Sequence, residues 1–228
     1  MASATKAVFF DVDYTLIYPG PMFQAIGYRE SCERHGITVD EARYPEAVRA
    51  ALCALDHEQV LYDDAVFTRF IGRIIEGMGG RGDRQIDACA REMYAAWAVC
   101  HHFHLYDEAE AVLRELAARN LKLGLISNSH RKLDDFVEHF QLHGLVAAAV
   151  SSAQHGYCKP HPSIFEAALA QAGVRAAESL MVGDSLTHDV EGARAVGMRG
   201  VLLHRGDGPP PAVDVPVIRS LTDLPPLV

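Results

Sequence analysis

Short apolar runs alternate with helical stretches over the C-terminal half of the chain. The apolar runs predict four strands: Leu121–Ile126, Val146–Ser151, Leu180–Val182 and Val201–His204. The stretches around them predict four helices: Asp107–Arg119, His130–His143, Pro162–Ala172 and His188–Val196. Glycines stand where three of these helices should end: Gly144, Gly173 and Gly197. Alternating strands and helices predict βαβ crossovers, and hence a parallel sheet with helices on both faces.

The N-terminal part of the chain follows a different pattern. It opens with one apolar strand, Ala7–Phe10, and from Met22 to about His102 no comparable run appears. Helices are predicted there instead: Met22–His35, Asp40–Leu55, Ala65–Met78 and Arg84–Cys100. Because a lone strand needs the sheet of the other half, we expect a discontinuous α/β core, Met1–Tyr18 with His104–Val228. An all-helical domain over residues 19–103 interrupts it, and the Pro-rich tail adds at most an edge strand at Val215–Ile218.

Composition and charge narrow the possible partners. With 228 residues, 49% of them hydrophobic, the chain can bury most of its apolar surface without disulfides or a structural metal. A formal net charge of −9 argues against nucleic-acid binding, and no apolar run is long enough to span a membrane. The five cysteines show no C-x-x-C pair, and the first residues do not have the long apolar stretch and small-residue cleavage site expected of a secretory signal. We therefore expect reduced thiols in a cytoplasmic protein.

Four polar segments follow predicted strands and carry the candidate chemistry. They are Asp11-Val12-Asp13-Tyr14-Thr15, Ser127-Asn128-Ser129, Lys159-Pro160 and Gly183-Asp184 with Asp189 downstream. In open α/β sheets ligands bind beyond the carboxyl ends of the strands, so these segments should gather at one edge. Asp11 and Asp13 could bind a cation and divide covalent and acid–base roles, and Asp184 could complete an oxygen site for Mg²⁺.

Each of these segments, taken singly, also has an ordinary structural interpretation. Two carboxylates after a strand can simply be solvated, and Ser127 is of a type common at helix N-caps and turns. Lys159 can be a surface lysine or, if buried, a compact positive charge for an anion. Asp189 can be a carboxylate that the helix macrodipole favours, and Thr15 can hydrogen-bond within its turn.

The order of the four segments is more specific. D-x-D-x-T, a strand-ending Ser, Lys-Pro and G-D-x-x-x-x-D in succession resemble the haloacid dehalogenase-like hydrolases, over essentially the whole chain. The resemblance implies a Rossmann-like parallel-sheet core with an inserted helical cap. It also implies that Asp11 is the nucleophile that forms an aspartyl-phosphate, and that Asp13 is the general acid and base. Tyr14 stands where many members have Gly, which puts the local loop geometry in question.

The resemblance also implies roles for the remaining candidates and a function. The phosphate-binding groups would be Ser127, Asn128 and Lys159. The metal ligands would be Asp11, Asp184 and the backbone carbonyl of Asp13, and Thr15 and Asp189 would have supporting roles. A carboxylate nucleophile and an anionic phosphate repel each other, so Mg²⁺ and Lys159 must offset the charge. The implied function is a Mg²⁺-dependent phosphatase, monomeric or homodimeric, for a small phosphorylated metabolite.

Other functions stay open at this point. A haloacid dehalogenase needs no acid for its halide leaving group, so Asp13 argues against it, whereas a phosphomutase would use the same residues. A non-catalytic binding protein would not need the whole set. His101-His102-x-His104 could bind zinc but lacks further clear ligands, and the glycine-rich Gly77–Gly82 favours a flexible connection between two helices.

Overall fold

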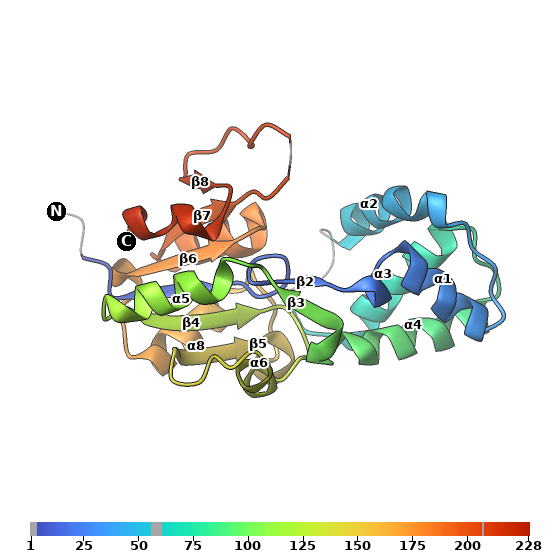
Figure 1. Ribbon diagram of the computed structural model, residues 1–228, viewed down its shortest axis with the longest axis horizontal. Helices are drawn as coiled ribbons and strands as arrows, with labels where there is room; N and C mark the ends of the chain where they lie inside the picture. Colours follow the sequence, from blue (N-terminus) through green and yellow to red (C-terminus); the bar gives the residue numbers. More distant parts are fainter. Residues whose placement is uncertain (1–3, 56–60, 207) are drawn as a thin grey trace. The chain divides into compact units, whose positions relative to one another are not determined.

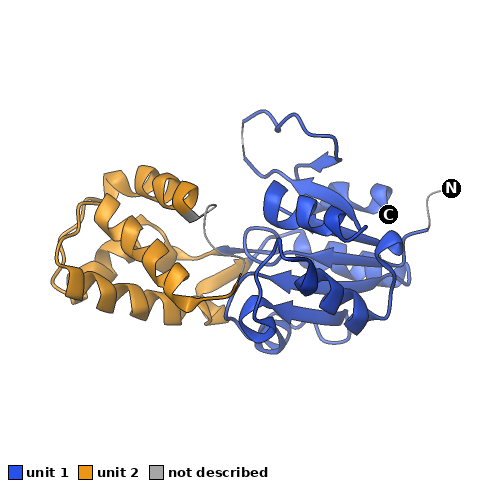
Figure 2. Ribbon diagram, turned by 180° about the vertical axis from the view of Figure 1, so that it is seen from behind, with its two compact units in different colours: residues 1–18, 105–228 blue, residues 19–104 orange. Residues whose placement is uncertain are grey.

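The computed structural model describes residues 4–55, 61–206 and 208–228 (Figure 1). The chain divides into two compact units, Met1–Tyr18 with Leu105–Val228, and Pro19–His104 (Figure 2). Among the described helices, none combines the length and the apolar character that a membrane crossing requires. None of the five cysteines, all of which lie in the described ranges, forms a disulfide.

A parallel six-stranded sheet forms the centre of the first unit, in the order β5-β4-β1-β6-β7-β8. Its strands are β1 Ala7–Phe10, β4 Lys122–Ser127, β5 Val146–Ser151, β6 Ser179–Gly183, β7 Arg199–Leu203 and β8 Val217–Ile218. The N-terminal strand β1 lies in the middle, with Phe10 in register with Leu125 on one side and Val182 on the other. The carboxyl ends of β1, β4 and β6 therefore lie next to one another. The predicted parallel sheet is confirmed.

Helices cover both faces of this sheet, also as predicted. They are α5 Ala109–Ala118, α6 Leu133–His139, α7 Ser152–His155, α8 Pro162–Ala172, a π-helix Leu186–Glu191 and α9 Gly192–Ala195, with short 3₁₀ turns at Ala176–Glu178, Leu221–Asp223 and Pro225–Leu227. On one face Phe165 of α8 packs with Phe9 and Met181 in a buried cluster. Because side chains alternate along a strand, Val8 and Phe10 point to the other face. There α5 lies over β4, in front of the sheet in Figure 1.

Two predicted helices of this unit have other bounds in the structure. The helix expected over His130–His143 runs from Leu133 to His139, and it ends there because Gln141 already takes the left-handed conformation (φ 55°). The helix expected over His188–Val196 begins earlier, as a π-helix. Its wider first turn lets the amides of both Asp189 and Val190 donate to the carbonyl of Ser185.

The second unit is helical, as expected for this stretch of sequence. Its helices are α1 Ala25–Arg34, α2 Tyr44–Leu55, α3 Asp64–Gly77 and α4 Asp83–Trp97, with 3₁₀ turns at Pro21–Phe23, Glu41–Arg43 and Cys100–His102. The apolar face predicted for α3 buries Ile71, Ile74 and Ile75. The glycine-rich segment after Gly77 connects α3 to α4. Where the chain passes between the units, two short strands that we did not predict pair with each other, β2 Ile17–Pro19 and β3 Phe103–Leu105.

Candidate active site

The edge of the sheet where β1 and β6 end holds a buried lysine between two carboxylates. Lys159 Nζ lies 2.6 Å from Asp11 Oδ1 and 2.6 Å from Asp189 Oδ1, and all three residues are buried. Asp11 follows β1 directly, and its amide donates to the carbonyl of Val182 on β6 (2.9 Å). The backbone of Asp11 is thus fixed by the sheet, and its side chain by Lys159.

Asn128 positions this lysine. Its side-chain Oδ1 accepts a hydrogen bond from the Lys159 amide (2.7 Å), and its Nδ2 donates to the Lys159 carbonyl (3.0 Å). Both ends of the Asn128 amide are thereby engaged with the backbone of Lys159. The neighbouring Ser127, expected with Asn128 to bind phosphate, is buried and donates its hydroxyl proton to Ser129 Oγ (3.0 Å).

The loop after β6 is built around Asp189. Oδ2 of Asp189 accepts a hydrogen bond from the Ser185 amide (3.0 Å), while Oδ1 accepts one from Lys159 Nζ (2.6 Å). Gly183 makes room for this carboxylate, since a Cβ at that position would overlap the Asp189 side chain. Both oxygens of Asp189 are therefore occupied by protein donors, which favours a role in holding Lys159.

Asp13 pairs with an arginine that the sequence did not single out. Arg131 Nη1 donates to both carboxylate oxygens of Asp13, at 3.1 and 3.2 Å. An isolated β-bridge between Asp13 and Ile17 closes the turn that lies between them. Within this turn Tyr14 adopts a left-handed backbone conformation (φ 62°). Gly adopts this conformation without strain, so Tyr14 adopts it at some cost in backbone strain. Thr15 is buried, and its carbonyl accepts from Arg205 (2.9 Å).

The carboxylates of the site hold their protons more strongly than usual. Burial, then repulsion from Asp189, raises the pKa of Asp11 to about 6, although Lys159 opposes the shift. The pKa of Asp184 rises to about 8, because desolvation of the carboxyl and repulsion from Asp11 and Asp189 disfavour its charge. Burial likewise raises the pKa of Asp13, with Arg131 opposing. Burial disfavours the charge of Lys159, but Asp11 and Asp189 outweigh it and raise its pKa.

The residues at this edge fit a divalent cation. Carboxylate oxygens of Asp11, Asp184 and Asp189 lie within 4.8 Å of one another. Hard oxygen ligands of this kind suit Mg²⁺. Three carboxylates around one lysine also leave two net negative charges when all are ionised, which is the charge that a divalent cation neutralises. Since Lys159 and Ser185 already occupy Asp189, Asp11 and Asp184 are the two carboxylates of this group that could serve as side-chain ligands.

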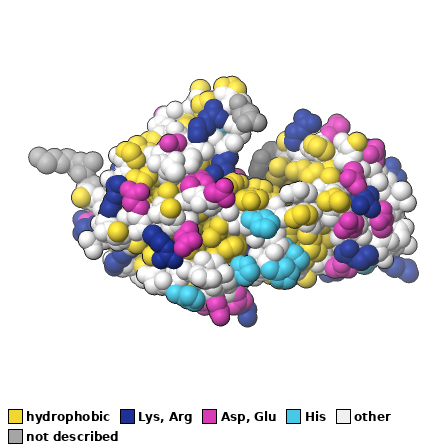
Figure 3. All heavy atoms as spheres, viewed as in Figure 1, with side chains coloured by type: hydrophobic (Ala, Val, Ile, Leu, Met, Phe, Trp, Pro, Cys, Tyr) yellow, Lys and Arg dark blue, Asp and Glu magenta, His cyan; other side chains and the backbone are white. Residues whose placement is uncertain are grey.

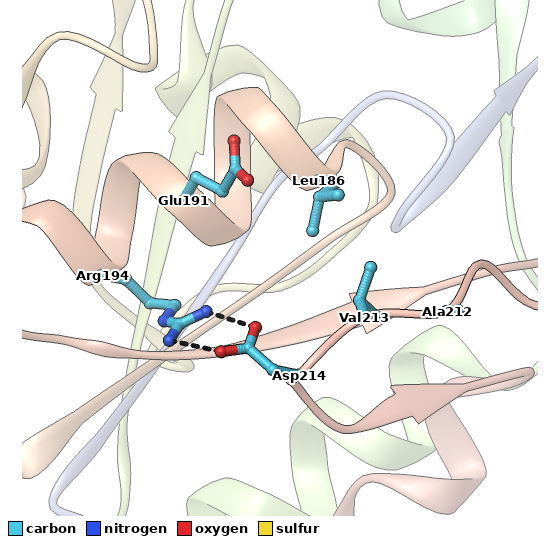
Figure 4. A pocket seen from close by; sticks show the side chains of 6 residues that line it. All are labelled: Leu186, Glu191, Arg194, Ala212, Val213 and Asp214. Atoms are coloured by element: carbon cyan, nitrogen blue, oxygen red, sulfur yellow. Dashed lines mark hydrogen bonds and ion pairs between the residues drawn. The ribbon is translucent and has the colours of Figure 1, made fainter.

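Other candidate features lie outside this cluster. Figure 4 shows a pocket of about 480 Å³ beside the π-helix, where Arg194 and Asp214 pair with each other at 2.7 Å. The pairing satisfies both charges, so the pocket offers little for chemistry. The rings of His101 and His102 lie 4.1 Å apart, but within the described ranges no third metal-ligand side chain joins them. On the face shown in Figure 3, basic and acidic side chains are interspersed, unlike the basic stripe of a nucleic-acid-binding face.

Comparisons with known proteins identify the family of the chain. The model of the haloacid dehalogenase-like hydrolase family matches residues 5–197. The chain is 31% identical over 143 residues to haloacid dehalogenase-like hydrolase domain-containing protein 3 of Danio rerio, covering 61% of this chain and 59% of that protein. It is 35% identical over 147 residues to a phosphoserine phosphatase of Thermus thermophilus, covering 60% of this chain and 54% of that one. The chain thus spans less than two thirds of both relatives.

A solved structure matches over nearly the full length. It is that of a HAD-hydrolase from Bacillus subtilis bound to magnesium, with a TM-score of 0.78 and 19% identity over 99% of both chains. At this identity the likeness establishes the fold alone.

Proposed function

Because the chain belongs to the haloacid dehalogenase-like hydrolase family, we propose that it is a Mg²⁺-dependent phosphatase that hydrolyses a small phosphorylated metabolite. The observation that carries the proposal is the buried contact between Lys159 and Asp11, with Asp184 beside them and a second carboxylate, Asp13, two residues away. Lys159 holds the Asp11 side chain in one orientation and supplies positive charge where an anionic phosphate would bind.

Asp11 is the nucleophile in this proposal. One of its carboxylate oxygens forms a bond to phosphorus, while the bond from phosphorus to the substrate oxygen breaks. Asp13 gives its proton to that leaving oxygen, which departs as an alcohol, and an aspartyl-phosphate remains on Asp11. Asp13, now a carboxylate, then takes a proton from a water molecule that attacks phosphorus. Inorganic phosphate leaves, the Asp11 carboxylate is restored, and Asp13 again carries its proton.

Charge compensation is the main requirement of this reaction. Mg²⁺, when bound, would screen the repulsion between Asp11 and the phosphate and stabilise charge on the transferring phosphoryl group. Asp11, Asp184 and the backbone carbonyl of Asp13 would hold it. The Lys159 ammonium offsets a further charge, and Asp189 and Asn128 keep that ammonium and its backbone in place. Ser127 completes the proposed phosphate site at the end of β4.

The test is phosphate release from p-nitrophenyl phosphate and from a panel of phosphorylated sugars, nucleotides and small acids. We expect activity that EDTA removes and Mg²⁺ restores, and none in Asp11→Asn. Asp107→Asn changes an exposed carboxylate and serves as the matched control, with activity retained. Full turnover in EDTA would contradict the metal assignment, and turnover in Asp11→Asn would contradict the nucleophile.

We further propose that the helical unit, Pro19–His104, is a cap that recognises the organic part of the substrate. Every proposed chemical group lies in the other unit, so replacing the cap by a Gly/Ser linker should leave Mg²⁺ binding intact. Turnover of the natural small substrate should collapse, while p-nitrophenyl phosphate should lose less. Equal turnover of small sugar phosphates with and without this unit would overturn the assignment.

A phosphomutase would retain the phosphoryl group on Asp11 and pass it to a second hydroxyl of the substrate. The same panel separates the two reactions, because a mutase yields an isomeric phosphate in place of inorganic phosphate. Halide release from a 2-haloacid would instead indicate a dehalogenase, which would leave Asp13 and its arginine partner without a function.

A further inference from the structure

Arg131 is a buried cation at the edge of the proposed site. Its side chain has no exposed surface, whereas that of its partner Asp13 is 18% exposed. The two residues are 118 positions apart in the sequence, and Arg131 Nη1 contacts both oxygens of the Asp13 carboxylate. A buried guanidinium is costly unless it is paired, so this contact is one that the fold has to maintain.

The backbone on both sides of this contact is fixed. Arg131 comes from the loop after β4, where the carbonyl of Ser129 accepts from the amide of Ala153 (3.3 Å) and the hydroxyl of Ser152 (3.4 Å). On the other side, the amide of Tyr14 donates to the carbonyl of Ile17 (2.7 Å) and closes the turn that carries Asp13. With both loops tied down, the guanidinium determines the direction in which the Asp13 carboxylate points.

The lack of exposed surface also limits what Arg131 can touch. A substrate that reaches the site from solvent meets Asp13, which is partly exposed, and not the guanidinium behind it. The contact with Asp13 is thus the one through which we expect Arg131 to act on the reaction. The proton transfer assigned to Asp13 depends on its distance and angle to the leaving oxygen, and a displacement of about 1 Å can cost roughly 10²-fold in rate.

We propose that Arg131 is a positioning residue that orients the Asp13 carboxylate for proton transfer to the leaving group. The inference rests on the proposed phosphatase function and deepens it. It predicts that a substitution of Arg131 lowers kcat more for a substrate whose leaving group needs protonation than for one whose leaving group does not. Alkyl phosphates need protonation, whereas nitrophenolate leaves with little help.

The experiment measures kcat and KM for Arg131→Met and Arg131→Lys on an alkyl phosphate and on p-nitrophenyl phosphate. For Arg131→Met we expect kcat to fall about 10- to 100-fold on the alkyl phosphate and less than about threefold on the nitrophenyl ester. KM should stay within about threefold for both substrates, because the phosphate site itself is untouched. Arg131→Lys should recover part of the kcat on the alkyl phosphate, since an ammonium can still donate to Asp13.

Two further variants separate positioning from general destabilisation. Leu113→Ala opens a cavity under α5 away from the site, and it should lower kcat on both substrates equally if at all. In the double variant Asp13→Asn with Arg131→Met, the loss on the alkyl phosphate should match that of Asp13→Asn alone, because both changes remove one function.

The proposal is overturned if Arg131→Met loses kcat equally on both substrates, or if its loss multiplies with that of Asp13→Asn. Should Arg131→Met fail to fold, the same comparison on Arg131→Lys decides, with equal losses again counting against positioning. A wild-type protein inactive on both esters with Mg²⁺ would instead refute the proposed function, and that outcome precedes any comparison of variants.

Discussion

The affinity for Mg²⁺ should depend steeply on pH, because two of its proposed ligands hold protons near neutrality. The pKa of Asp184 is raised to about 8 and that of Asp11 to about 6. A protonated carboxyl is a poor ligand, so the ion must displace the protons as it binds. Since both pKa values are raised, lowering the pH from 8 to 6 adds protons to the ion-free site. Mg²⁺ should therefore bind more weakly at lower pH.

The size of the effect follows from these two pKa values. Between pH 8 and pH 6 the competing proton on Asp184 raises the apparent Kd about 50-fold, and that on Asp11 about twofold, or roughly 100-fold together. At pH 7 the two pKa values correspond to the release of about one proton per ion bound.

Isothermal titration calorimetry with MgCl₂ at pH 6, 7 and 8 measures the affinity. Paired buffers of different ionisation enthalpy measure the protons released. Asp184→Asn removes the group with the higher pKa, so its remaining pH dependence should shrink to about twofold. Asp107→Asn, an exposed carboxylate, should behave as wild type. A wild-type Kd that changes less than about threefold over this pH range, without proton release, would refute the reasoning.

Three further substitutions test how the site and the fold are held together. Lys159→Met leaves the carboxylates of Asp11 and Asp189 buried without their shared cation. The free energy of unfolding, measured by urea denaturation, should therefore fall by about 3–5 kcal/mol, and a decrease below about 1 kcal/mol contradicts this. In Gly183→Ala the added methyl group would overlap the Asp189 carboxylate and displace it. Because Asp189 holds Lys159, the Mg²⁺-dependent kcat should fall at least about tenfold, whereas an unchanged kcat would show that the loop adapts. Gln141→Gly relieves a positive φ of 55° on an exposed residue and should raise stability by about 0.5–1 kcal/mol, seen as a Tm increase of about 1–4 °C; a lower Tm rejects this account.

Much of the fold could be predicted because its signals are local. The apolar runs Val146–Ser151 and Ala7–Phe10 are both strands of the sheet, with the same bounds as predicted. Ala7–Phe10 is buried throughout, whereas Val146–Ser151, at the edge of the sheet, is buried only in part. The helix Pro162–Ala172 has Pro in its first turn and ends at Gly173, which is left-handed (φ 62°). In each case the residues that determine the element lie within it or directly next to it, so no knowledge of the tertiary structure was needed.

The elements that the sequence analysis did not predict, or predicted with other bounds, have a common physical cause. The paired strands β2 and β3 are three residues each, too short for an alternation of polar and apolar residues to appear. The early end of α6 depends on Gln141 adopting a conformation that sequence patterns assign to Gly144. Gln141 can do so because Leu142, directly after it, is fully buried and directs the chain back into the core.

The candidate site divides in the same way. Asp11, Lys159 and Asp184 could be selected because each stands where a strand or its loop ends, and the parallel order of the sheet brings such ends together. Arg131 gave no comparable signal, since an arginine three residues beyond Asn128 looks like any solvated loop residue. Only the tertiary structure shows that it is buried against Asp13. Loops after strand ends therefore merit attention to every charged residue in them.

The charges of the site predict that, in the proposed reaction, a metal ion binds before the substrate. Four carboxylates, of Asp11, Asp13, Asp184 and Asp189, lie among two cations, those of Lys159 and Arg131. Fully ionised, the ion-free site carries two net negative charges, and a phosphate dianion brought to about 4 Å meets a repulsion of roughly 4 kcal/mol for each pair of unit charges at an effective dielectric constant near 20. Lys159 cannot remove this repulsion alone, because Asp11 and Asp189 already share its charge. In the proposed reaction a divalent cation would neutralise the excess negative charge, and we therefore expect phosphate to bind once the cation is in place.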